Sequence, residues 1–352
     1  GWHCSRRKPD GCALPVSEKP GMAGVLCYRE TRSQQQALRR PCPLSLVSLV
    51  LALLIEQARP LQYRQIVFGP VSRLADMLDG LFNAGEKKHG VVAWLIGVGG
   101  LVLAGGLVYA LLFALNPLFA LAWNVLILYA TMGFRQFSHY YTDIQLALRM
   151  QDLPRARQLL GEWRGKSAEG LSSSDVARLS IEEALASSHR HVFGVLLWFV
   201  LLPGPCGAIL YRAAAVFSEH WGRQDTDPVA PGFASFAQQA FAAIDWLPLR
   251  ATAAAFAVVG DFEDAVYCWR TQAGNWPDDE IGIVLASGAG ALGVRLGMPV
   301  MESGEVSDRA ELGTGDDADV DFMQSAVGLV WRAIVLWVVL LLLLGLASLV
   351  GG

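Results

Sequence analysis

The sequence predicts an all-α, polytopic integral membrane protein with about four to five membrane segments and helical polar loops. Composition is the first observation: 53% of the 352 residues are hydrophobic and 17% are charged, whereas a soluble domain carries about 25% charged residues. The second is a set of apolar runs that approach or exceed the roughly 20 residues with which a helix crosses a bilayer. The third is the helical spacing of apolar residues in the polar segments between those runs.

The same composition argues against several other classes of protein. The net charge of −4 and the lack of a basic stripe give no electrostatic footprint for nucleic acid. Six cysteines, without the spacing of a zinc site, predict neither a disulfide framework nor a structural metal. Residues 1–43 are polar, rich in Arg, Pro and Gly, and without periodicity, so we expect a disordered segment or a spurious N-terminal extension.

The first membrane segments follow this extension. The run 44–55 is short for a span, while residues 91–115 carry no charge and form the clearest one. Two glycine pairs in that span, at 99–100 and 105–106, predict close helix packing. Asn116-Pro117 then ends the helix and the apolar segment 117–134 returns, which predicts a helical hairpin.

Two further membrane segments lie in the second half of the chain. Residues 192–217 are apolar but contain Pro203-Gly204-Pro205, and because proline removes a helix hydrogen bond we predict a broken or re-entrant helix there. Residues 333–350 are apolar without interruption and predict the last span. The stretch 237–259 carries charges and a proline, so we place it at the membrane interface rather than across the bilayer.

The polar loops differ in the sign of their charge. Basic residues are frequent before the hairpin and in the loop 135–191 after it, and the positive-inside rule makes this side cytoplasmic. Within that loop, apolar spacing predicts one helix over 144–160, and Ser174-Asp175 predicts a cap for a helix over 176–187. Residues 218–330 form an acidic polar region, which lies on the opposite side if 192–217 crosses the membrane.

Two clusters near the third membrane segment could carry chemistry. Glu182-Glu183 and His189-Arg190-His191 could perform acid–base work or hold a metal. The simpler interpretation, a solvated helix end at the membrane surface, is the favoured one. Arg212 follows the glycine-rich break, where it could meet an anionic group or extend to the membrane surface.

Two later stretches also stand out. Asp245 and Arg250 lie in apolar sequence, where they should pair with each other or with another polar group, because an isolated charge near lipid is costly. The glycine-rich run 287–297 allows either tight packing or the approach of backbone to a ligand.

Taken in order from residue 44 onwards, these landmarks resemble the CobD/CbiB family of cobalamin-biosynthesis membrane proteins. The similar stretches are 149–157, 204–212, 245–250 and 290–297, and the last reproduces the family's Gly-Ala-Leu-Gly-x-x-Leu-Gly motif. The resemblance implies a multi-pass protein of the bacterial inner membrane, of the adenosylcobinamide-phosphate synthase type. Such a protein forms an amide bond between a corrinoid carboxylate and aminopropanol or its phosphate.

The resemblance also implies partners and site residues. The partners are the lipid bilayer, a corrinoid substrate and other cobalamin-biosynthesis proteins, while Mg²⁺ and a nucleotide or activated acyl group could serve the reaction. No metal ligand is assigned. The implied catalytic residues are Glu183, His191, Arg212, Asp245 and Arg250. The implied substrate-binding residues are Gly204, Gly207, Tyr211, Gly290, Gly293 and Arg295.

The sequence departs from the family pattern at its acidic positions. The family's acidic stretch before the third segment aligns with Glu183, Ser187, Ser188 and His191, and its Asp-Asp pair with Phe241-Ala242. Losing carboxylates removes acid–base groups and metal ligands, which predicts a degenerate active site. The alternative is the AmpE family of non-enzymatic membrane sensors or regulators, which 244–250 resembles, although 287–297 is similar to CobD/CbiB instead.

Overall fold

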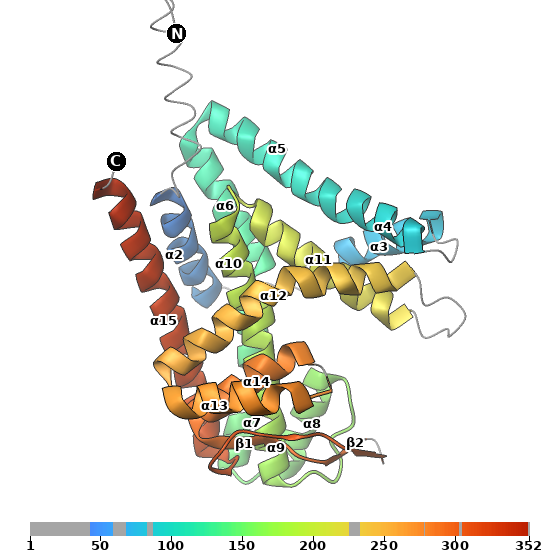
Figure 1. The fold of residues 1–352 in the computed structure, drawn as a ribbon, viewed down its shortest axis with the longest axis vertical. Helices are drawn as coiled ribbons and strands as arrows, with labels where there is room; N and C mark the ends of the chain where they lie inside the picture. The colour runs from blue at the N-terminus through green and yellow to red at the C-terminus, as the bar shows by residue number, and fades with distance from the viewer. Residues whose placement is uncertain are drawn as a thin grey trace, which may run out of the picture. The chain divides into compact units, whose positions relative to one another are not determined.

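The computed structural model of the protein describes residues 43–58, 68–82, 87–224, 233–277, 279–302 and 305–350. The predicted extension 1–43 therefore lies outside the described residues, apart from Pro43. Most of the described chain is helical (Figure 1). The helices are α2 (Pro43–Ala58), α3 (Gly69–Phe82), α4 (Lys87–Trp94), η2 (Leu95–Gly99), α5 (Gly100–Leu115), α6 (Pro117–Thr131), α7 (Phe134–Arg149), α8 (Leu153–Arg164), α9 (Ser173–Ser188), η3 (His189–Phe193), α10 (Gly194–Leu201), α11 (Cys206–Gln224), α12 (Phe233–Val259), α13 (Phe262–Gln272), η4 (Ala273–Asn275), α14 (Asp279–Leu292) and α15 (Val320–Val350). The strands are β1 (Val294–Gly297), β2 (Val300–Glu302), β3 (Glu305–Ser307), β4 (Glu311–Leu312) and β5 (Asp316–Asp317).

The predicted class, a helical protein of the membrane, is confirmed. Among the described residues, four helical stretches are long and apolar enough to cross a bilayer: Lys87–Leu115, Ser173–Leu201, Phe233–Val259 and Val320–Ala347. Helix α2 packs against α6 and α15, and the three helices run alongside one another in Figure 1. The third stretch contains 237–259, so the part that we placed at the membrane interface is long and apolar enough for a span.

The hairpin of α5 and α6 forms as its sequence dictates. The Asn116 side chain accepts a hydrogen bond from the Leu118 N–H at 2.9 Å, and the proline occupies the first helical position, where its missing N–H costs nothing. Gly105 and Gly106 lie directly against Ile209 and Cys206 of α11. The other glycine pair, 99–100, has open space around it, so the predicted close packing holds for the second pair alone.

The segment 192–217 is divided between two helices. Ser173–Leu201 is continuous through α9, η3 and α10, after which the chain reverses direction over residues 202–205. Gly204 takes the left-handed conformation, at φ 62°, that this turn requires. Helix α11 then packs back against α10 so closely that Gly207 touches the backbone of Trp198. The predicted break is thus a reversal of the chain.

The helix expected over 144–160 is wrong as a single element, because the chain turns between α7 and α8. Asp152 caps α8 by accepting from the Arg155 N–H at 3.1 Å, Pro154 lies in its first turn, and Gln151 has a φ of 60°. The cap of α9 is also shifted from the expected residues. Ser172 and Asp175 form a reciprocal capping box at the start of that helix.

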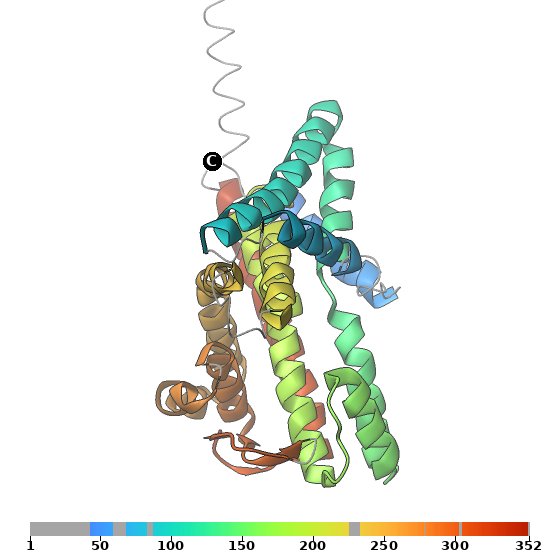
Figure 2. The same cartoon turned by 90° about the vertical axis from the view of Figure 1, so that its right-hand side faces the viewer.

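The short strands were not predicted from the sequence. They form a three-stranded sheet in the order β4-β1-β5 and a β2-β3 pair. Strand β1 and helix α14 pack against α9, and the Ser174 hydroxyl donates to the Ala318 carbonyl at 2.8 Å. Figure 2 shows the strands and helices α7 to α9 at the same end of the bundle. The helices of the loop 135–191 and the strands of the acidic region therefore pack together at this end of the bundle.

Candidate active site

A polar cavity of about 1200 Å³ lies between α8, the α9–η3 helix, α11 and α12. Three of the predicted catalytic residues, Glu183, His191 and Arg212, line it together. Its walls also carry charged side chains of both signs and two stacked aromatic rings. These are Glu162, Glu219, Glu280, Arg164, Arg190, Arg223, Tyr140 and Trp163. The combination of ionisable groups, hydrogen-bond donors and flat apolar surface is typical of a site for a polar organic ligand.

A histidine–arginine contact forms one wall of this cavity. The Arg212 guanidinium donates to His191 Nδ1 at 2.7 Å and to the Arg190 carbonyl at 3.4 Å. Arginine can only donate hydrogen bonds, so Nδ1 accepts and the proton of a neutral imidazole lies on Nε2. His191 therefore presents an N–H donor, rather than a base, through its second nitrogen.

Glu183 supplies the nearest carboxylate on the same helix face. Its Oε1 accepts from the Ser187 hydroxyl at 3.3 Å, and its side chain is half-buried at the edge of the cavity. Spacings of four and eight residues place Glu183, Ser187 and His191 on one face of α9–η3. The π-helical turn η3 lies at this point, and such turns are frequent at functional sites.

Asp245 does not line the cavity but lies behind its wall in a buried cluster. It accepts from the Tyr211 hydroxyl at 2.8 Å, and its two carboxylate oxygens lie 3.0 and 3.1 Å from His189 Nε2. His189 Nδ1 lies 2.9 Å from the Thr252 hydroxyl. Asp245 is 3% exposed and His189 is 0% exposed, so the pair is shielded from both solvent and lipid. The sequence left open whether Asp245 pairs with Arg250 or with another polar group. The partners found are His189 and Tyr211.

Helix α12 is anchored beside this cluster by a second contact. Pro248 has no N–H to donate to the carbonyl of Ile244, one turn earlier. The Trp198 indole of α10 donates to that carbonyl at 3.1 Å and so satisfies it.

The other predicted site residues lie away from the cavity. Arg250 donates to the Trp246 carbonyl at 3.0 Å and covers the Trp246 ring, on the outer side of α12. Arg295 pairs with Asp317 at 2.9 Å in the small sheet. Gly204 and Gly207 serve the turn and the helix packing described above. The remaining predicted residues also have structural roles. Gly290 touches the backbone of α13, Gly293 takes a φ of 65° at the end of α14, and Tyr211 is buried in the Asp245 cluster.

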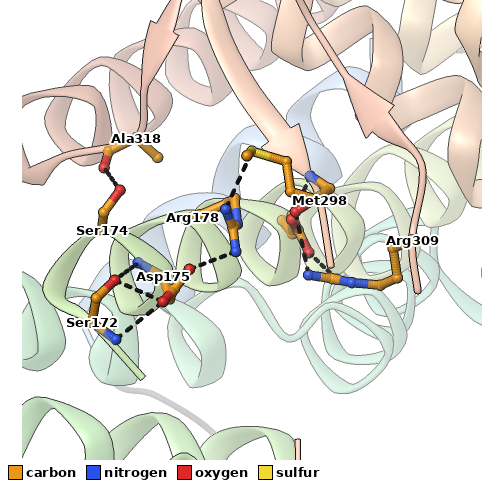
Figure 3. Close-up of polar contacts among 9 residues, drawn as sticks. Ser172, Ser174, Asp175, Arg178, Met298, Arg309 and Ala318 are labelled. Carbon is orange, nitrogen blue, oxygen red and sulfur yellow. Dashed lines mark hydrogen bonds and ion pairs between the residues drawn. The ribbon is translucent and has the colours of Figure 1, made fainter. Parts of the chain in front are cut away.

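Glu182 belongs to a different buried cluster, on the side of α9 that packs against β1. It pairs with Arg309 at 2.7 Å and accepts from the Gly297 N–H at 2.9 Å. Figure 3 shows Arg178 of α9 between Asp175 and Met298, with a contact to each, and Arg309 further along. The favoured interpretation of 182–191 as a solvated helix end is therefore wrong. Glu182 and His189 are seven residues apart, a spacing that places both on one buried face.

Comparisons with known proteins agree with the resemblance seen in the sequence. A family model described as CobD/Cbib protein matches residues 47–330. The chain is 34% identical over 291 residues to the cobalamin biosynthesis protein CobD of Stutzerimonas stutzeri, an alignment that covers 82% of this chain and 91% of that protein. It is 34% identical over 224 residues to CobD of Chromobacterium violaceum, covering 64% of this chain and 71% of that protein. It is 26% identical over 267 residues to the cobalamin biosynthesis protein CbiB of Salmonella typhimurium, covering 72% and 80% respectively. No solved structure matches the chain.

Proposed function

The chain belongs to the CobD/CbiB family of cobalamin biosynthesis, and we propose that its cavity joins a corrinoid carboxylate to aminopropanol or its phosphate. The observation that carries this proposal is the meeting of Glu183, His191 and Arg212 in one polar cavity. We place the reaction at the inner membrane of a bacterium, with the corrinoid bound between η3, α11 and α12.

The three residues can divide the work of forming an amide bond. The amine must lose a proton as its nitrogen bonds to the acyl carbon, and the Glu183 carboxylate can take that proton. As the new C–N bond forms, the bond from the acyl carbon to its activating group breaks. Arg212 and the Nε2–H of His191 can donate to the oxygen on which negative charge develops. The carboxyl group must reach this step activated, as a nucleotide-derived or other acyl donor.

The carboxylates of the cavity do not fit a dedicated metal site. In the described ranges, no three His, Cys, Asp or Glu side chains gather closely enough to hold a metal ion. A site supplied mainly by protein carboxylates is thus absent from this part of the chain, and we derive no step through Mg²⁺.

An AmpE-like sensor or regulator is the second candidate. Ser187, Phe241 and Ala242 line the cavity at positions where the family pattern has carboxylates. Aromatic, methyl and hydroxyl groups cannot replace a carboxylate as base or ligand. This observation favours a protein that keeps the binding site and has lost part of its catalytic groups.

Complementation separates the two candidates. A cobalamin-auxotrophic strain that lacks its own synthase would be fed a corrinoid precursor without the aminopropanol arm. We expect the wild-type chain and Arg250→Gln to restore growth and Arg212→Gln to fail, because Arg212 lines the cavity and Arg250 does not. Failure of the wild-type chain, at normal membrane expression, rejects the synthase and favours the regulator.

A further inference from the structure

The buried cluster behind the cavity wall joins three helices at one point. Asp245 of α12 receives the Tyr211 hydroxyl of α11 at 2.8 Å and faces His189 of η3 at 3.0 Å. Thr252, two turns further along α12, faces the other nitrogen of the same imidazole at 2.9 Å. Both ring nitrogens of His189 are therefore occupied. The two contacts of His189 join η3 to α12 at two points, and the Tyr211 hydrogen bond joins α11 to α12.

Charge balance explains why such a cluster persists in an apolar environment. A single buried carboxylate near lipid is costly, and an imidazole beside it offsets that cost, either as a charged partner or as a donor. The Tyr211 hydroxyl supplies a second donor to the carboxylate. Because these groups are buried, water cannot replace a lost partner. Breaking any of the hydrogen bonds therefore leaves a polar group unsatisfied, which is costly.

Two of the four buried residues, Tyr211 and His189, lie within two positions of a residue that faces the cavity. On α11, Tyr211 points into the cluster while Arg212, the next residue, lines the cavity. On η3, His189 is buried while His191 lines the cavity. A rotation of α11 or η3 that broke the buried bonds would also separate Arg212 from His191, whose contact is 2.7 Å. None of the four cluster residues lines the cavity, so none is placed to touch a ligand there.

We propose that His189, Tyr211, Asp245 and Thr252 form a buried positioning network that holds the His191–Arg212 pair in the cavity wall. Tyr211 and Asp245 are then positioning residues and not a substrate contact and a catalytic acid, as the family resemblance had implied. The inference rests on the proposed function only in taking the cavity as the reaction site.

Chemical modification of His191 tests the network without requiring turnover. Diethyl pyrocarbonate acylates an unprotonated imidazole nitrogen, and in His191 that nitrogen, Nδ1, is covered by Arg212. We expect Tyr211→Phe and Asp245→Asn to raise the modification rate of His191, measured by peptide mass spectrometry on the full-length protein in detergent. Loosening one charged hydrogen bond should raise the rate about fivefold, or ~1 kcal/mol at 1.36 kcal/mol per tenfold.

The chain offers two matched controls. The Tyr141 hydroxyl of α7 is also buried and donates to the Met323 backbone carbonyl at 2.8 Å, outside the network, so Tyr141→Phe also removes one buried tyrosine hydrogen bond. It should leave His191 modification unchanged. Thr252→Ser keeps the hydroxyl and should match the wild type, whereas Thr252→Val should raise the rate.

Three outcomes would overturn the proposal: equal rates for Tyr211→Phe and Tyr141→Phe, no increase in either network variant, or no difference between Thr252→Val and Thr252→Ser. The threonine pair decides the question if Tyr211→Phe does not fold. A chain that fails complementation but shows the expected modification pattern loses the synthase proposal and keeps the positioning network.

Discussion

Removing the buried Glu182 should destabilise the protein far more than removing an exposed carboxylate that also pairs with an arginine. Its carboxylate pairs with Arg309 at 2.7 Å and accepts from the Gly297 N–H at 2.9 Å. The two side chains of the pair are 8% and 10% exposed, so water cannot replace the lost partner. Glu182→Ala leaves a buried guanidinium without its counter-charge and removes the acceptor of the Gly297 N–H, which should cost about 3–5 kcal/mol in the free energy of unfolding.

The assay is equilibrium unfolding of the purified protein in detergent, with denaturant as the variable. Asp317→Ala is the matched control, because Asp317 pairs with Arg295 at 2.9 Å but is 66% exposed. An exposed pair contributes about 0–1 kcal/mol. Replacing both members of the buried pair, as in Glu182→Met with Arg309→Met, should recover most of the loss, since no charge is then left unpaired. Equal losses for Glu182→Ala and Asp317→Ala would refute the reasoning.

Three further predictions concern the helices around the site. Trp198→Phe should cost about 1–3 kcal/mol in the free energy of unfolding, because the carbonyl left free by Pro248 loses its donor; in a Pro248→Ala background the cost should shrink, and an unchanged cost would contradict this. Burial raises the pKa of the Tyr141 hydroxyl, so its contribution to stability is complete below the unfolded-state value of about 10 and is lost as the pH rises above it. The difference between wild type and Tyr141→Phe should therefore fall at high pH, and a growing difference would be the wrong sign. Reporter enzymes fused at Lys166 and at Pro277 should both be active in the cytoplasm; activity on opposite sides would contradict the packing of α9 against β1 and α14.

The membrane frame could be predicted from the sequence because long apolar runs leave few alternatives. The uncharged run 91–115 and the break at Asn116-Pro117 specify α5, α6 and the turn between them through length and helix chemistry alone. The sequence was less decisive at 192–217. A proline-glycine turn is compatible with a kink, a re-entrant loop or a reversal, and the choice depends on α10 and α11 packing through Gly207.

The candidate site shows a similar division. Glu183, His191 and Arg212 were identified from sequence and do meet in the cavity, whereas Arg250 and Arg295 do not, because an arginine near a motif can as well serve a helix surface or a sheet. His189 was noticed but its role was not, since its partners are 56 and 63 residues away in sequence. Long-range pairing of this kind leaves no local signal.

Binding of a corrinoid tests the central claim most directly. The purified protein in detergent would be titrated with a corrinoid precursor that lacks the aminopropanol arm, and binding followed by visible absorbance after equilibrium dialysis. We predict binding by the wild type and by Arg250→Gln, and binding about 10- to 100-fold weaker by Arg212→Gln, as expected when a charged hydrogen bond is lost. Absence of binding by the wild type, or equal affinity for the wild type and Arg212→Gln, would contradict the assignment of the cavity.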